Sequence, residues 1–231
     1  MKTKTEGIVL SVSDYKENSE KISVLTKDKA YLSFIIRGSA KMTARNKIFP
    51  LTVYEFIYDE KDGRDMYAMQ GRNVVRSYLS HDLKKDAFTD VLIEAVRRIT
   101  CEETNELYED LLFVLDNLEK APYLYGSYLL TRLLYYSGFR PYIDGCVVCD
   151  SKLIAGLSIE RGGLVCAQHK KATDIDDLDL VRHFRHLQLL TKENLPLYKE
   201  EITLEDFKLL IDFIERHLDL RMRSFSFFLA L

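Results

Sequence analysis

The chain has 231 residues, of which 47% are hydrophobic and 30% are charged. This composition suits one large or two ordinary globular domains and excludes an intrinsically disordered protein. The formal charge of −3 argues against a protein that coats nucleic acid over its whole surface. No run approaches the roughly 20 apolar residues that span a bilayer, and no signal peptide is evident, so we expect a cytoplasmic protein with no membrane partner.

Charge is divided unevenly along the chain. Residues 1–76 contain 14 Lys and Arg against 10 Asp and Glu, a net charge of +4, whereas residues 77–231 contain 19 against 26, a net charge of −7. A polyanionic partner is therefore expected to meet the N-terminal part.

Short apolar runs rich in Val, Ile, Tyr and Phe occupy the chain up to about Val75. They read GIVLSV, KISVLT, YLSFII, LTVYEFIY and MYAMQ, and polar turns separate them. The Asp-Gly pair in KDGR, at 61–64, is typical of a hairpin turn. These five short strands predict a small β-barrel domain over residues 1–79.

From Leu83 onward the apolar residues recur at helical spacing. Helices are predicted from Leu83 to Ile99, over 107–118, from Pro122 to Gly138, over 178–190 and after Thr203, where TLED is typical of a capping box. The predicted fold class is therefore α+β and multidomain. A β-barrel is followed by an all-helical domain, residues 80–231, which is interrupted by a candidate metal-binding segment, residues 142–172.

This interrupting segment carries two close pairs of metal-ligand residues, CVVC and CAQH. The four ligands are Cys146, Cys149, Cys166 and His169, with sixteen residues between the pairs. Such spacing lets each pair bind one face of a tetrahedral ion, and four protein ligands leave no open position for water. One structural zinc ion is predicted, and Gly162 and Gly163 allow the tight turn before the second pair. The alternative is a chance spacing, and Cys would be more usual than His at position 169.

Two other histidines, His183 and His186, lie three residues apart on a predicted helix. They could share a metal ion, but no third ligand lies nearby in the sequence, so we expect surface residues. The chain contains no nucleotide-binding, metalloprotease or serine-hydrolase signature, and we expect no enzymatic activity.

A window from Lys29 to Tyr54 contains no acidic residue but five basic ones: Lys29, Arg37, Lys41, Arg45 and Lys47. In RGSAKMTARNKIFP the basic residues alternate with small and hydroxyl-bearing ones, which is typical of a loop that follows a phosphate backbone. The alternative is a solvated loop that is basic by chance.

Aromatic residues at Tyr54, Phe56 and Tyr58 share one face of a predicted strand. They could stack on bases, but alternating aromatics on a strand are more typical of a barrel interior, which is the expectation here.

Several stretches of the chain together resemble the RecO family of bacterial recombination mediators. GIVLSVSDYKENSEKISVLTKDKAYLSFIIRGSAK resembles the opening of that family, and TRLLYYSGFRPYIDGCVVC with GGLVCAQH resembles its helix and zinc segment. LRMRSFSFFLAL resembles its C-terminal helix. The resemblance implies an N-terminal OB-fold, a helical domain and a zinc segment.

The resemblance also implies a function. Members bind single- and double-stranded DNA, anneal complementary strands and help load RecA onto DNA coated with single-stranded DNA-binding protein. The implied partners are DNA, RecR and the C-terminal tail of single-stranded DNA-binding protein, with RecA an indirect partner, in the cytoplasm at the nucleoid. Enzymatic turnover is not implied.

Residue by residue, the resemblance assigns DNA contacts to Arg37, Lys41, Arg45 and Lys47, and partner binding to Arg132 in TRLL. It assigns zinc to Cys146, Cys149, Cys166 and His169. Two other classes stay open. A zinc-containing transcription regulator would prefer particular duplex sequences, and a zinc hydrolase or nuclease would need an open coordination position.

Overall fold

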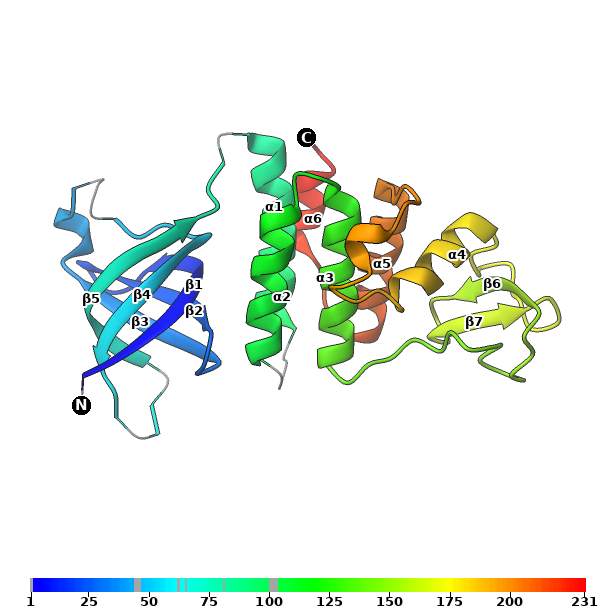
Figure 1. The fold of residues 1–231 in the computed structure, drawn as a ribbon, viewed down its shortest axis with the longest axis horizontal. Helices are drawn as coiled ribbons and strands as arrows, with labels where there is room; N and C mark the ends of the chain where they lie inside the picture. The colour runs from blue at the N-terminus through cyan, green and yellow to red at the C-terminus, as the bar shows by residue number, and fades with distance from the viewer. Residues whose placement is uncertain (1, 44–46, 62, 65, 81, 100–103) are drawn as a thin grey trace. The chain divides into compact units, whose positions relative to one another are not determined.

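The computed structural model describes residues 2–43, 47–61, 63–64, 66–80, 82–99 and 104–231. It divides into two compact units, Met1–Asp86 with Glu103–Glu109 and Ala87–Glu102 with Asp110–Leu231. The first unit contains the strands of a barrel, and the second contains most of the helices (Figure 1).

Five strands form a closed barrel: β1 (Lys2–Asp14), β2 (Ser19–Thr26), β3 (Tyr31–Arg37), β4 (Thr52–Asp59) and β5 (Met66–Ser77). Their order around the barrel is β1-β2-β3-β5-β4. Neighbours are antiparallel except β3 and β5, which are parallel. This five-stranded arrangement is that of an OB-fold, so the predicted barrel is confirmed.

Aromatic side chains fill the barrel interior. Tyr54, Phe56 and Tyr58 of β4 are at most 2% exposed, and the ring of Phe34 from β3 stacks on that of Phe56 at 4.7 Å. The prediction that these aromatics belong to the core is confirmed, and bases cannot reach them without opening the barrel.

The loop after β3, which belongs to the acid-free window from Lys29 to Tyr54, lies at one end of the barrel. β3 ends at Arg37, and Gly38, with a φ of 74°, turns the chain into a short 3-10 helix, η1 (Ser39–Lys41). The Gly38 amide donates to the Asn18 carbonyl at 2.7 Å, which ties the loop to the β1–β2 hairpin. The β2–β3 turn and the end of β4 lie at the opposite end, where Lys29 pairs with Glu60.

In the part of the chain that the structure describes, six α-helices follow: α1 (Leu83–Arg98), α2 (Thr104–Asn117), α3 (Pro122–Tyr136), α4 (Leu178–Leu187), α5 (Leu204–His217) and α6 (Arg223–Phe228). Pro122 occupies the first turn of α3, where its missing N–H costs nothing. The predicted capping box is present, since Thr203 and Asp206 bond reciprocally at the start of α5. The helical periodicity therefore predicted α1 to α5 to within a few residues, whereas α6 was expected only from the family resemblance.

Large rings hold the helical unit together. Phe88 of α1 lies 4.9 Å from Phe207 of α5 and 5.3 Å from Phe228 of α6, measured between ring centroids. A Cβ at Gly126 of α3 would lie only 2.8 Å from the Phe88 ring, so glycine allows this close approach.

The candidate metal-binding segment, residues 142–172, folds around a two-stranded hairpin of β6 (Ile154–Ser158) and β7 (Gly163–Cys166). Gly162 has a φ of 73°, and a Cβ at Gly163 would lie 2.6 Å from the Tyr142 carbonyl oxygen. Gly162 thus allows the tight turn, as the sequence predicts, and Gly163 allows the close approach of the Tyr142 backbone. Among the described residues, no helix is long and apolar enough to cross a membrane.

Candidate metal and nucleic-acid sites

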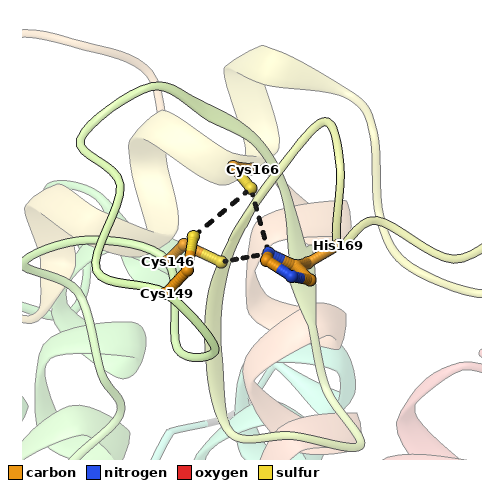
Figure 2. A group of neighbouring side chains, drawn as sticks. All are labelled: Cys146, Cys149, Cys166 and His169. Atoms are coloured by element: carbon orange, nitrogen blue, oxygen red, sulfur yellow. Dashed lines mark hydrogen bonds between the residues drawn. The ribbon is translucent and has the colours of Figure 1, made fainter.

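The four predicted metal ligands converge on one point (Figure 2). Cys146 and Cys149 belong to a turn before β6, Cys166 ends β7, and His169 follows in the next turn. The Sγ atoms of Cys149 and Cys166 are 3.8 Å apart. Nδ1 of His169 lies 3.3 Å from Sγ of Cys166 and 3.7 Å from Sγ of Cys146.

These separations fit a tetrahedral ion. Bond lengths of about 2.3 Å to sulfur and about 2.0 Å to nitrogen place neighbouring ligands about 3.5 to 3.8 Å apart. All four ligand atoms lie within 4.8 Å of one another, and the three cysteines are free thiols. The four residues can therefore hold one metal ion.

The backbone prepares Cys146 for metal binding. Burial opposes ionisation of its thiol, but N–H hydrogen bonds from Cys166, Val148 and Cys149 outweigh that effect and lower the pKa to about 6. A thiolate, the form that binds metal, is thus available near neutral pH.

A small apolar cluster lies beside the ligands. It consists of Cys146, Val165 and Cys166, with Val147 packed against them. A metal ion bound there would crosslink the turn at Cys146 to the end of β7 and add to the local stability.

Exposed basic residues collect at one end of the barrel. Arg37 ends β3, Lys41 ends η1 and Lys47 lies shortly before β4. The structure thus brings three of the four predicted DNA-binding residues to the same end. Arg45 lies outside the described residues. The role of all four in DNA binding stays a prediction.

Two further arginines on β5 reach this end of the barrel. Nη2 of Arg72 lies 3.4 Å from the carbonyl oxygen of Lys47, and Arg76 pairs in register with Val53 at the start of β4. Sequence reasoning missed both because the predicted strand ended at Gln70, whereas β5 continues to Ser77. The run GRNVVRS was the available signal, but only the β4–β5 pairing places it beside the loop.

Arg132 of α3 is half-buried and held from two sides. Its Nε donates to Oδ2 of Asp110 at 3.1 Å and its Nη2 donates to the hydroxyl of Tyr136 at 2.8 Å. Asp110 is buried and also accepts from Lys192 at 2.9 Å. The guanidinium is therefore fixed before any ligand arrives.

Arg132 lines a cleft of about 400 Å³. Arg140 also lines it, with its guanidinium 4.2 Å from the centroid of the Tyr135 ring. Phe139, Leu189 and Leu190 supply apolar walls. Nε2 of Gln188, another lining residue, is buried and has no hydrogen-bond partner within the described chain. Sequence reasoning missed Arg140 and Gln188, because no local pattern marks either residue as part of a site.

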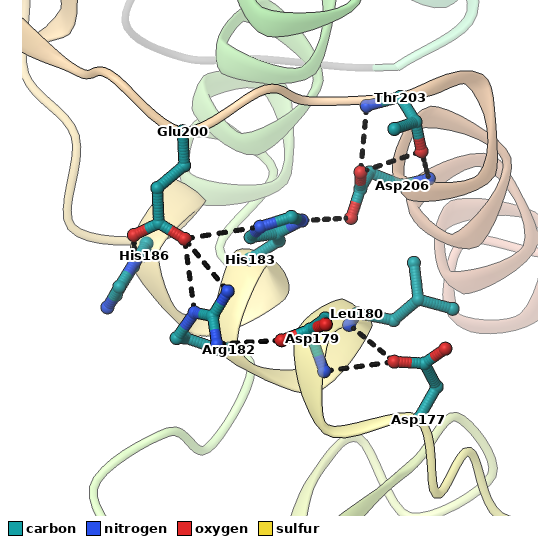
Figure 3. Close-up of polar contacts among 9 residues, drawn as sticks. All are labelled: Asp177, Asp179, Leu180, Arg182, His183, His186, Glu200, Thr203 and Asp206. Atoms are coloured by element: carbon teal, nitrogen blue, oxygen red, sulfur yellow. Dashed lines mark hydrogen bonds and ion pairs between the residues drawn. The ribbon is translucent and has the colours of Figure 1, made fainter.

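One expectation about the remaining histidines is wrong. His183 was expected on the surface but is only 9% exposed, because Phe184 beside it packs into the α4–α5 interface and its Nδ1 lies 2.9 Å from Oδ1 of the buried Asp206 (Figure 3). His186 is more exposed, at 39% of its side chain.

Two family models account for nearly the whole chain. "Recombination protein O N terminal" matches residues 1–78, and "Recombination protein O C terminal" matches residues 80–225. The chain belongs to the RecO family. As a RecO-family DNA repair protein, it combines the OB-like barrel and the helical region that the resemblance implied.

Curated RecO relatives agree with this assignment. The chain is 29% identical over 192 residues to the DNA repair protein RecO of Caldicellulosiruptor bescii, covering 78% of this chain and 77% of that protein. It is 28% identical over 178 residues to DNA repair protein RecO of Exiguobacterium sibiricum, covering 73% and 70%. The corresponding protein of Bacillus cytotoxicus is 22% identical over 175 residues, covering 72% and 70%.

Proposed function

We propose that this RecO-family protein is a recombination mediator. It binds single- and double-stranded DNA without sequence preference, anneals complementary strands and helps load RecA onto DNA coated with single-stranded DNA-binding protein. One observation carries this proposal: basic residues at the end of β3, in the segment that follows it and on β5 lie at one end of an OB-type barrel.

The chemistry of that end favours contact with phosphates. Arg37 at the end of β3, and Lys41 and Lys47 in the segment that follows, are exposed cations, whereas the aromatics of β4 that could stack on bases are buried. Phosphate contacts carry no sequence information, and neutralising phosphates lowers the repulsion between two strands. Sequence-independent binding of this kind is what annealing requires.

The metal in this proposal is a single structural zinc ion. Three thiolates and one imidazole are donors that zinc prefers, and when bound it crosslinks the turn at Cys146 to the end of β7. Because all four positions are protein ligands, the site has no place for a substrate. We accordingly assign no enzymatic activity to it.

The partner-binding part of the proposal rests on the cleft at Arg132. We assign it to the C-terminal tail of single-stranded DNA-binding protein, because two arginines suit a terminal carboxylate and apolar walls suit a hydrophobic end. The amide of Gln188 offers a further buried donor. In this proposal residues 1–79 bind DNA, and residues 80–231 bind protein partners, RecR among them.

The test removes three cations from the basic end. Arg37→Ala/Lys41→Ala/Lys47→Ala should weaken binding to single-stranded DNA and slow strand annealing. Each lost phosphate contact reduces the log–log salt slope by about 0.7 for single strands, so the slope should fall by about 2. Fluorescence anisotropy across a salt series measures both quantities.

A matched control removes the same charge from the other end of the barrel. Lys2, Lys27 and Lys61 are exposed and lie near the start of β1, in the β2–β3 turn and just after β4. Their triple alanine variant should bind DNA almost as the wild type does. Equal losses in both variants would refute the loop assignment, and strong preference among duplex sequences would favour a transcription regulator.

A further inference from the structure

Phe49 is an exposed aromatic residue in the segment between η1 and β4. It is 41% exposed. Among the described residues up to Ser80, every other phenylalanine and tyrosine is buried or half-buried. The phosphate contacts proposed for this end of the barrel involve cations alone, and they leave the ring of Phe49 without a role.

The backbone on both sides of Phe49 is anchored to the barrel. Ile48 is 4% exposed and belongs to the barrel core. The amide of Phe49 donates to the hydroxyl of Tyr54 at 3.3 Å, and the amide of Leu51 donates to a carbonyl of β1 at 2.9 Å. Pro50 follows directly and disfavours helical backbone at Phe49. The ring therefore extends into solvent from a well-supported backbone.

The surroundings of Phe49 are positively charged. Lys47 is exposed, and its carbonyl oxygen accepts from Nη2 of Arg72 at 3.4 Å. Arg76 lies on β5 opposite the start of β4. The first acidic residue that follows in the sequence, Glu55, already accepts from a lysine at 3.1 Å and from an asparagine at 3.0 Å. A phosphate backbone would thus be attracted to the surface beside the ring.

An exposed ring beside cations suits one kind of nucleic acid, a single strand. Cations hold the phosphates while an unpaired base stacks on the ring, and every base has a π-face, so stacking needs no particular sequence. The bases of a duplex are stacked on one another already, and separating them to admit a side chain costs free energy. The ring of Phe49 therefore favours unpaired bases over a duplex.

We propose that Phe49 stacks on an unpaired base of single-stranded DNA and thereby makes the barrel prefer single strands to duplexes. Lys47 holds a phosphate next to that base. This inference rests on the proposed DNA-binding function and adds to it a contact that cations cannot supply. Because stacking releases no counterions, its contribution should persist at salt concentrations that weaken the phosphate contacts.

The test removes the ring from the protein and the bases from the DNA. Phe49→Ala should bind a mixed-sequence single strand about tenfold more weakly and should bind a duplex as the wild type does. Its log–log salt slope should be unchanged, because no phosphate contact is lost. An abasic strand of the same length keeps every phosphate, and the wild type and Phe49→Ala should bind it equally. Fluorescence anisotropy measures all of these affinities.

A second variant reports stacking directly. The chain contains no tryptophan, so Phe49→Trp introduces a single indole fluorophore. Its emission should be quenched when the single strand is added and should change little with the abasic strand, because only a stacked base quenches it. Phe227→Trp is the matched control, since Phe227 is 54% exposed on α6. Neither strand should quench its emission.

Two outcomes would overturn this inference alone. If Phe49→Ala weakened binding to the normal and the abasic strand equally, the ring would only support the fold of its segment. If the variant bound the normal strand as the wild type does, the ring would not contact DNA, and the phosphate contacts of the basic residues would still stand. A wild-type protein that bound no single strand would overturn the proposed function together with this inference.

Discussion

His169 is the residue at which the candidate metal centre differs from the more usual four-cysteine pattern. Its Nδ1 lies within 3.7 Å of the sulfurs of Cys146 and Cys166, so the imidazole occupies the corner where a fourth sulfur would otherwise lie. A neutral imidazole in place of a thiolate leaves the centre one charge less negative. The site therefore keeps four donors with less repulsion among them.

We predict that His169→Cys retains one bound ion, because the new thiolate restores four donors. His169→Ala should bind zinc more than about tenfold more weakly, since one corner of the tetrahedron is lost. Competition with a chromophoric chelator measures both affinities. Gln168→Ala, an exposed neighbour, is the control, and an unchanged affinity in His169→Ala would show that His169 is not a ligand.

At the scale of single elements, α6 depends on a side chain from α1. A six-residue helix is too short to be stable by itself. The carboxylate of Glu94 accepts from the amides of Arg223 and Ser224, at 3.2 and 2.8 Å, and from the Ser224 hydroxyl. Burial raises the pKa of Glu94, but these bonds, with one from Arg98, outweigh it and lower the pKa below its ordinary value.

Glu94→Gln should therefore lower the free energy of unfolding by about 2 kcal/mol at neutral pH, since charge-assisted hydrogen bonds are lost. Because the folded-state pKa is depressed, the contribution is present above the ordinary value of 4.5 and is lost as the pH falls through the folded-state pKa. The free energies of unfolding of the wild type and of Glu94→Gln should therefore become similar at acidic pH. Urea unfolding at neutral and acidic pH tests this, and a pH-independent difference would contradict it.

At the scale of the whole molecule, the two parts of the chain differ in charge. Residues 1–76 carry a net charge of +4, from 14 basic and 10 acidic residues. Residues 77–231 carry a net charge of −7, from 19 basic and 26 acidic residues. Solvent screens exposed charges over about 8 Å at physiological salt, so we expect the proposed DNA-binding and partner-binding tasks to be separable by substitution.

A pair of variants tests this separation. Arg140→Ala should weaken binding of a peptide with the tail sequence of single-stranded DNA-binding protein by about tenfold and leave DNA affinity unchanged, because one carboxylate contact is worth roughly 1.5 kcal/mol. The triple variant Arg37→Ala/Lys41→Ala/Lys47→Ala should bind DNA more weakly and bind the peptide as the wild type does. Arg97→Ala, exposed on α1, is the control for Arg140. If Arg140→Ala or the triple variant weakened both peptide binding and DNA binding, the two tasks would not be separate.

Local patterns in the sequence were sufficient to predict much of this protein. Strand and helix periods, the capping box at Thr203, and the two ligand pairs depend on residues close together in the chain, where spacing itself dictates geometry. The barrel, the helices and the convergence of four metal ligands were predicted for that reason. The acid-free window identified three exposed cations that the fold brings together.

Only the tertiary structure decided which distant residues meet. Arg72 reaches Lys47 because β5 pairs with β4 beyond its predicted end, and Arg132 faces Asp110 because α3 packs against α2. His183 is buried between carboxylates 17 and 23 residues further along the chain, Glu200 and Asp206. Such contacts depend on how helices and strands bury their apolar faces, and the chain that joins them can close in many ways. Periodicity predicts which face of an element is buried, but packing alone selects the partner it is buried against.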